Sequence, residues 1–281
     1  MKWRRLLPYL DVILEVADAR LPRASRNGEL VSRVEGKDRI LLLNKVDLAD
    51  SHLLYRWLHY LRHSEGIPVI GVSGLSGQGM TKLEALLARL TRTRPPRRQN
   101  RPLRAVVVGI PNVGKSTLIN RLLGRAAART GAHPGITRGE QWLRLRPGLE
   151  LLDTPGRLSI RQDLPFWQLA ALRAVPAPED RLQSSAEDLL TAVSRLYPGR
   201  LADVYGQPEP PTLEQVARAR GLIGKGGLPD PARAAGVVWT DFWNGRWGGL
   251  TLETPPADET GGLPQTATIG GYQASDPEGH Q

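Results

Sequence analysis

A glycine-rich segment at residues 109–117 has the composition of a phosphate-binding loop. Its sequence, Gly-Ile-Pro-Asn-Val-Gly-Lys-Ser-Thr, matches G-x-x-x-x-G-K-[ST]. Glycines let backbone N–H groups converge on phosphate oxygens, and a following helix N-terminus adds a favourable dipole. We expect Lys115 to reach the β- and γ-phosphates and the Ser116 hydroxyl to bind Mg²⁺. The expected contacts are Gly109, Asn112, Val113, Gly114, Lys115, Ser116 and Thr117.

A second candidate phosphate contact lies 37 residues beyond Ser116, where Asp-Thr-Pro-Gly occupies positions 153–156. A carboxylate at the end of an apolar run can hold Mg²⁺ through water, and a glycine N–H can donate to a γ-phosphate. We therefore expect Asp153 to support the metal and Gly156 to face the γ-phosphate. This pattern also occurs in ordinary turns, and it indicates a phosphate contact here because it follows a phosphate loop at this distance.

Asn44-Lys45-Val46-Asp47 offers a candidate site for a purine base. The Asp47 carboxylate can accept from N1–H and the 2-amino group of guanine, a donor pair that adenine lacks. We expect Asn44 to brace the loop and the Lys45 stem to lie over the base. Ser73-Gly74 follows another apolar run, where a backbone N–H can meet guanine O6. Together with the phosphate loop, this set predicts a guanine nucleotide.

Short apolar runs rich in branched residues precede these motifs, at residues 10–17, 39–43, 68–72, 105–109 and 149–152. Nearly continuous apolar runs are typical of parallel strands buried on both faces. Leucines at helical spacing lie between them, at residues 53–61, 83–90 and 118–123. Alternating strands and helices predict a doubly wound α/β sheet, whose carboxyl edge would gather the motifs.

The strand pattern fades near residue 177, and helical patterns follow at residues 186–196, 213–220 and 237–247. We predict an α/β domain over residues 1–176 and a small all-α domain over 177–253. Residues 254–281 carry four prolines and five glycines, which predicts a disordered tail. Residues 92–104 contain six arginines and no acid, which predicts an exposed basic connection within the first domain.

Composition narrows the function classes. The 281-residue chain has no cysteine, which excludes disulfides, thiolate catalysis and cysteine-bound metals. No apolar run approaches the roughly 18 residues of a membrane helix, so we expect no membrane partner. The absence of cysteine fits a reducing compartment, and we expect the protein to be cytoplasmic. Residues 1–176 hold 30 Lys/Arg against 14 Asp/Glu, whereas residues 177–253 hold 8 against 10. The excess predicts a nucleic-acid partner, and solvated surface arginine is the alternative.

The order of the motifs is unusual, because the guanine motif precedes the phosphate loop. The order resembles that of the circularly permuted P-loop GTPases of the YlqF/YawG type. Further matches are Asp18-Ala-Arg20-Leu-Pro22, Pro134-Gly135-Ile136-Thr137, Arg195-Leu-Tyr-Pro198, Lys225-Gly226-Gly227 and Asp241-Phe242. The resemblance covers about residues 9–253. It implies the same sheet with circularly permuted connections, rejoined through the basic segment.

The resemblance implies hydrolysis of GTP to GDP, slow in isolation and stimulated by the large ribosomal subunit, during maturation of that subunit and its rRNA. It implies that Thr137 binds Mg²⁺ in the GTP state, so the catalytic candidates are Lys115, Thr137 and Gly156. It also places Asn112 where related GTPases recruit K⁺, which would neutralise transition-state charge. We expect the protein to act as a monomer.

Two departures from the family leave the catalytic details open. Family members usually begin with a segment containing Phe-Pro-Gly-His, which this sequence lacks. Arg157 follows the Asp-Thr-Pro-Gly motif, where other GTPases carry a water-orienting glutamine. A GTP-dependent RNA scaffold with negligible hydrolysis is therefore the alternative. Two roles are possible for Asp18-Ala-Arg20: contact with a partner, or a salt bridge that fixes a loop.

Overall fold

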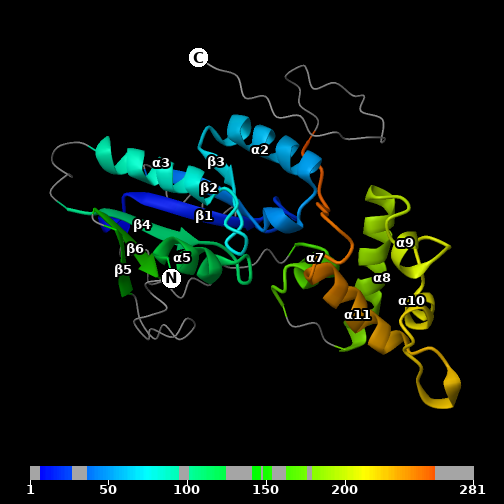
Figure 1. The fold of residues 1–281 in the computed structure, drawn as a ribbon. Helices are drawn as coiled ribbons and strands as arrows, with labels where there is room; N and C mark the ends of the chain where they lie inside the picture. The colour runs from blue at the N-terminus through cyan, green and yellow to red at the C-terminus, as the bar shows by residue number, and fades with distance from the viewer. Residues whose placement is uncertain are drawn as a thin grey trace.

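A computed structural model describes residues 7–26, 37–94, 101–124, 141–146, 148–153, 163–175 and 179–256 (Figure 1). Its α/β part is built on one six-stranded sheet in the order β3-β2-β1-β4-β6-β5. All neighbouring strands are parallel except β5 and β6. The strands are β1 (Val12–Asp18), β2 (Asp38–Asn44), β3 (Val69–Gly71), β4 (Leu103–Val108), β5 (Gln141–Arg146) and β6 (Leu149–Asp153).

Helices cover both faces of this sheet, which confirms the doubly wound fold. Alternate side chains of β2 pack on opposite faces of the sheet. Leu41 and Leu43 share a core with Trp57 of helix α2 (Ser51–Glu65). Ile40 and Leu42 belong to the opposite core, together with apolar residues of α3 (Met80–Arg92) and α5 (Lys115–Leu123). This alternation is the period of two that a strand imposes on its side chains.

Strand β5 is absent from the apolar runs on which the fold was predicted. Its sequence Gln-Trp-Leu-Arg-Leu-Arg alternates, with Leu143 and Leu145 separated by Arg144. Such alternation is typical of an edge strand with one solvated face. A search for continuous apolar runs detects central parallel strands and misses this antiparallel edge.

The C-terminal part is helical, as predicted, and lies beside the sheet (Figure 1). Its helices are α7 (Phe166–Ala171), α8 (Glu179–Leu196), α9 (Ala202–Tyr205), α10 (Leu213–Ala219) and α11 (Pro231–Trp243). The predicted helix at 237–247 is shifted: Asp230 caps α11 and Pro231 begins it, so Trp247 lies beyond its end. The predicted domain boundary at 176–177 lies outside the described residues, and α7 already packs against α8 and α11.

The chain returns to the sheet after α11. The Leu250 N–H donates to the Leu48 carbonyl, and the Leu252 N–H donates to the Arg20 carbonyl. Trp57, buried in α2, donates its indole N–H to the Glu253 carbonyl at 2.8 Å. Residues 250–253 therefore tie the helical part to the sheet. The predicted tail lies outside the described residues from position 257 onward.

Within the described part of the chain, no helix combines the length and apolarity that crossing a bilayer requires.

Candidate functional site

The predicted motifs gather at one edge of the sheet because their strands are parallel. The phosphate loop follows β4, Asn44 ends β2, Ser73 follows β3, and Asp153 ends β6. Strand β4 pairs in parallel with β1 and β6, so the carboxyl ends of these strands lie together. This edge is where doubly wound sheets bind ligands.

The phosphate loop has the backbone that its sequence predicts. Gly114 has φ 95° and precedes α5, while Asn112 has φ 62°. A Cβ on Gly109 would lie 2.5 Å from the Val16 carbonyl oxygen, so the loop crosses β1 at a distance that only glycine permits. Ser116 and Thr117 are exposed at the start of α5, where they can reach a ligand.

Lys115 is folded back over this loop. Its Nζ donates to the Ile110 carbonyl at 2.7 Å. Burial lowers the pKa of Lys115 to about 8, because removal from water disfavours the ammonium. A phosphate at this position would supply a counter-charge. The lysine is therefore set for an anionic ligand.

Asn44 joins the loop that follows β2 to the phosphate loop. Its Nδ2 donates to the Val113 carbonyl at 2.8 Å, and its Oδ1 accepts from the Gly74 N–H at 3.0 Å. Both hydrogen bonds are buried. A Cβ on Gly114 would lie 2.2 Å from Nδ2, so this contact requires glycine there. The amide thus connects three of the predicted motifs, in the bracing role expected of it.

Lys45 and Asp47 occupy the rim of this arrangement. Lys45 has φ 65° and precedes the 3-10 helix η2 (Val46–Leu48). Its Nζ contacts Asp18 Oδ2 at 2.8 Å, while Asp47 is exposed. An exposed carboxylate beside the braced loop is available to the edge of a base.

The loop after β3 is held by a residue that sequence reasoning missed. Arg121 of α5 donates through Nε to the Gly74 carbonyl at 3.0 Å and also contacts the Leu75 carbonyl. A Cβ on Gly74 would lie 3.0 Å from the Leu118 nitrogen. Arg121 belongs to no recognised motif. The only sequence signal for its role is its position on α5, one helical turn after Thr117. The expected contact of Ser73 or Gly74 with guanine O6 stays a prediction.

Other predicted residues lie elsewhere or outside the description. Asn112 donates through Nδ2 to the Arg173 carbonyl at 2.6 Å, which links the phosphate loop to the turn after α7. Thr137, Gly156 and Arg157 lie outside the described residues, as does the side chain of Asp153. Their predicted contacts with Mg²⁺ and the γ-phosphate, and that of Asn112 with K⁺, remain predictions.

The basic connection is partly neutralised where the structure describes it. Arg101 binds Asp11 through two contacts of 2.8 Å, and Arg94 Nη1 lies 3.8 Å from the same carboxylate. Arg104 contacts Glu150 at 3.1 Å. These arginines anchor the segment to the sheet. The formal charge therefore overstates the positive charge that is available to bind a polyanion.

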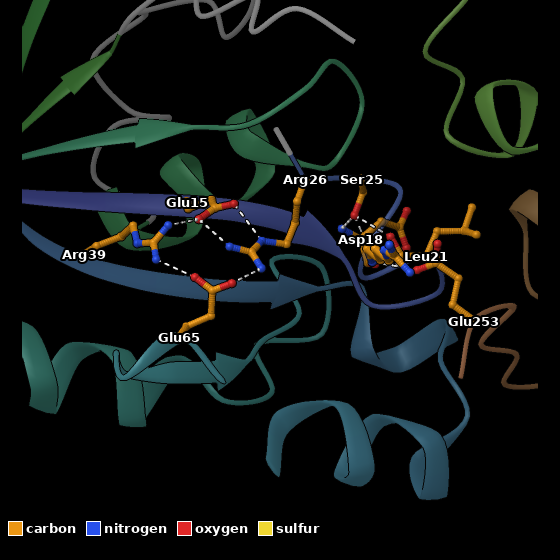
Figure 2. A network of polar contacts seen from close by, with 9 residues as sticks. Glu15, Asp18, Leu21, Ser25, Arg26, Arg39, Glu65 and Glu253 are labelled. Carbon is orange, nitrogen blue, oxygen red and sulfur yellow. Dashed lines mark hydrogen bonds and ion pairs between the residues drawn. The ribbon is translucent and has the colours of Figure 1, made fainter. Parts of the chain in front are cut away.

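The segment after β1 is fixed by ion pairs, which answers the question left open for Asp18-Ala-Arg20. Asp18 and Arg20 are buried and contact each other at 2.9 Å. Figure 2 shows a second network in which Arg26 and Arg39 lie between Glu15 and Glu65. Glu253 accepts from the backbone N–H groups of residues 23 and 24 at 2.6 and 3.0 Å. The segment is thereby tied to the sheet and to the C-terminal part.

Several known proteins are similar to this chain over most of its length. Residues 104–194 match the family described as 50S ribosome-binding GTPase. The chain is 35% identical to ribosome biogenesis GTPase A of Bacillus cereus over 261 residues, covering 89% of this chain and 88% of that protein. The GDP-bound structure of TM YlqF aligns with a TM-score of 0.64 at 29% identity, covering 92% and 100% of the two chains. GNP-bound YlqF from T. maritima aligns at 0.62 and 30%, covering 91% and 97%.

Proposed function

Because the chain belongs to the ribosome biogenesis GTPase A family, we propose that it binds and hydrolyses GTP while acting on the large ribosomal subunit during its assembly. The observation that carries the nucleotide assignment is the Asn44 bridge. One buried amide, that of Asn44, joins the guanine loop (residues 44–47) to the phosphate loop and to the loop after β3. In this proposal the exposed Asp47 carboxylate would contact the base and the Lys115 ammonium would contact the phosphates of one nucleotide.

Different residues of this chain would bind the phosphates, hold the metal ions and promote hydrolysis. Lys115 would bind the β- and γ-phosphates and stabilise charge that develops between them. Ser116, Thr137 and Asp153 would hold Mg²⁺, which neutralises phosphate charge. The exposed position of Ser116 and the lowered pKa of Lys115 fit an anionic, metal-bound ligand. Gly156 would contact the γ-phosphate, and Asn112 would hold K⁺.

Partner recognition in this proposal uses the positive charge of the α/β part. Residues 1–176 carry a net charge of +16, whereas residues 177–253 carry −2. A phosphate backbone would favour the first surface, and the helical part would be oriented against rRNA by its contacts to the sheet. Hydrolysis of GTP would then release the helical part from rRNA, and the protein would leave the subunit. We place this cycle in the cytoplasm and assign it to a monomer.

Binding of fluorescent GTP, GDP, ATP and XTP tests the nucleotide assignment. We expect guanine nucleotides to bind and ATP not to bind. Asp47→Asn should shift preference from guanine towards xanthine, because the amide pairs with the 2-oxo group that xanthine carries. Lys115→Ala should abolish tight binding, whereas Lys82→Ala, an exposed change on α3, should leave it intact. Normal GTP affinity in Lys115→Ala would contradict the phosphate site.

Co-sedimentation tests the partner. The protein should pellet with purified large ribosomal subunits in a non-hydrolysable GTP analogue, and less so in GDP. Small subunits and tRNA serve as controls for non-specific attraction of a basic protein. Retention on tRNA but not on large subunits would contradict the ribosomal assignment while leaving GTP binding untouched.

A further inference from the structure

A single buried carboxylate contacts both the guanine loop (residues 44–47) and the segment after β1, which in turn contacts the helical part. Asp18 ends β1 and is fully buried. Its Oδ2 contacts Lys45 Nζ at 2.8 Å and Arg20 Nη2 at 2.9 Å. Its Oδ1 accepts from Arg20 Nε at 3.1 Å and from the Arg20 backbone N–H at 3.0 Å. Burial alone would raise the pKa of Asp18, but Arg20 and Lys45 hold it well below its usual range.

Arg20 carries this contact into the helical part. Its Nη1 lies 3.4 Å from the Phe242 carbonyl oxygen, and its guanidinium sits 4.7 Å from the centre of the Phe242 ring. Phe242 belongs to α11 and is itself buried. The Arg20 carbonyl also accepts from the Leu252 N–H at 2.8 Å. Arg20 therefore contacts both the last turn of α11 and the segment that returns from it.

The surroundings leave this segment little freedom. Ser25 Oγ accepts from the Asp18 N–H at 2.8 Å and donates to the Leu21 carbonyl at 2.7 Å (Figure 2). Arg26 joins the ion-pair network with Glu15 and Glu65. A segment fixed at both ends transmits a displacement of Arg20 to Asp18 instead of absorbing it.

We propose that Asp18 and Arg20 are positioning residues that couple binding of the guanine base to docking of the helical part. This inference rests on the proposed function, because it requires Lys45 to contact the base. Asp18 would set the position of the Lys45 side chain, whose stem lies over the base, and Arg20 would tie the same carboxylate to α11. Because the coupling is thermodynamic, it is reciprocal: nucleotide strengthens docking, and docking strengthens nucleotide binding.

The test is a double-mutant cycle read by GDP affinity in the full chain. Phe242→Leu keeps an apolar side chain but removes the ring beneath Arg20, and it lies on a different element from the guanine loop. We expect it to weaken GDP binding about five- to tenfold, at the lower end of the usual range of coupling between sites. The effect should disappear in the Asp18→Asn background. Val238→Ala, a buried change in α11 that leaves the Arg20 contacts in place, should not alter GDP affinity.

Amide exchange supplies the reciprocal readout. GDP should slow hydrogen exchange of the Leu252 N–H in the wild type but not in Arg20→Lys. This variant keeps the positive charge but loses the bidentate contact with Asp18. Arg20→Lys also replaces Asp18→Asn in the cycle if the latter does not fold. Wild-type GDP affinity in both Phe242→Leu and Arg20→Lys would overturn the coupling. Failure of the wild type to bind any guanine nucleotide would instead overturn the proposed function.

Discussion

Replacing Asn44 by alanine should both destabilise the fold and weaken nucleotide binding. The substitution removes two buried hydrogen bonds, of 2.8 Å to the Val113 carbonyl and 3.0 Å from the Gly74 N–H. Each backbone group left without a partner costs about 1–3 kcal/mol. Partial access of water to the new space offsets some of this, so we expect the free energy of unfolding to fall by about 2–5 kcal/mol. The freed loops should also lower GDP affinity.

Urea unfolding followed by tryptophan fluorescence measures the change, with GDP titration on the same preparations. Asn244→Ala is the matched control, because Asn244 is exposed at the end of α11 and the chemical change is identical. The control should alter the free energy of unfolding by no more than about 0.5 kcal/mol. An equally small effect for Asn44→Ala, with unchanged GDP affinity, would refute the argument that this amide holds the site together.

Two further predictions concern buried charge. At about pH 8.5 the nucleotide-free protein should have lost most of the Lys115 proton, since its pKa is about 8, so GDP binding should take up about 0.75 proton. Calorimetry in buffers of different ionisation enthalpy measures this uptake, and Lys115→Arg should abolish it; equal uptake in both proteins would contradict the assignment. Asp241→Ala should lower the free energy of unfolding by about 1–3 kcal/mol, because it leaves the Tyr205 hydroxyl without its buried acceptor and removes the ion pair with Arg220. Exposed Asp203→Ala is the control in the same urea assay, and equal effects would contradict a structural role for Asp241.

The nucleotide motifs were predictable because each depends on residues that are local in sequence. The phosphate loop needs glycines at the left-handed position before α5, and Gly114 at φ 95° meets that requirement. Parallel strands then bring the separate loops to one edge without further information. Asn44 ends β2 at this same edge, so its amide lies beside the neighbouring loops and can hydrogen-bond to them.

The ion pairs were less predictable because their partners are distant in sequence. Nothing local indicates that Arg20 meets Phe242, 222 positions away, or that Glu253 caps the segment after β1. Arg121 likewise holds the loop after β3 from a helix surface that carries no motif. The arginines that Asp11 engages are also less available to nucleic acid than their number in the sequence indicates, because they already contact a carboxylate.

The most direct test of the central claim is multiple-turnover GTP hydrolysis by the 281-residue chain, in potassium and in sodium, with and without purified large ribosomal subunits. We expect slow phosphate release from the protein alone and a marked increase with subunits, greatest in potassium. Lys115→Ala should remove both rates. Tight GTP binding with no phosphate release under any of these conditions would contradict a GTP-hydrolysing assembly factor and would favour a GTP-dependent RNA scaffold.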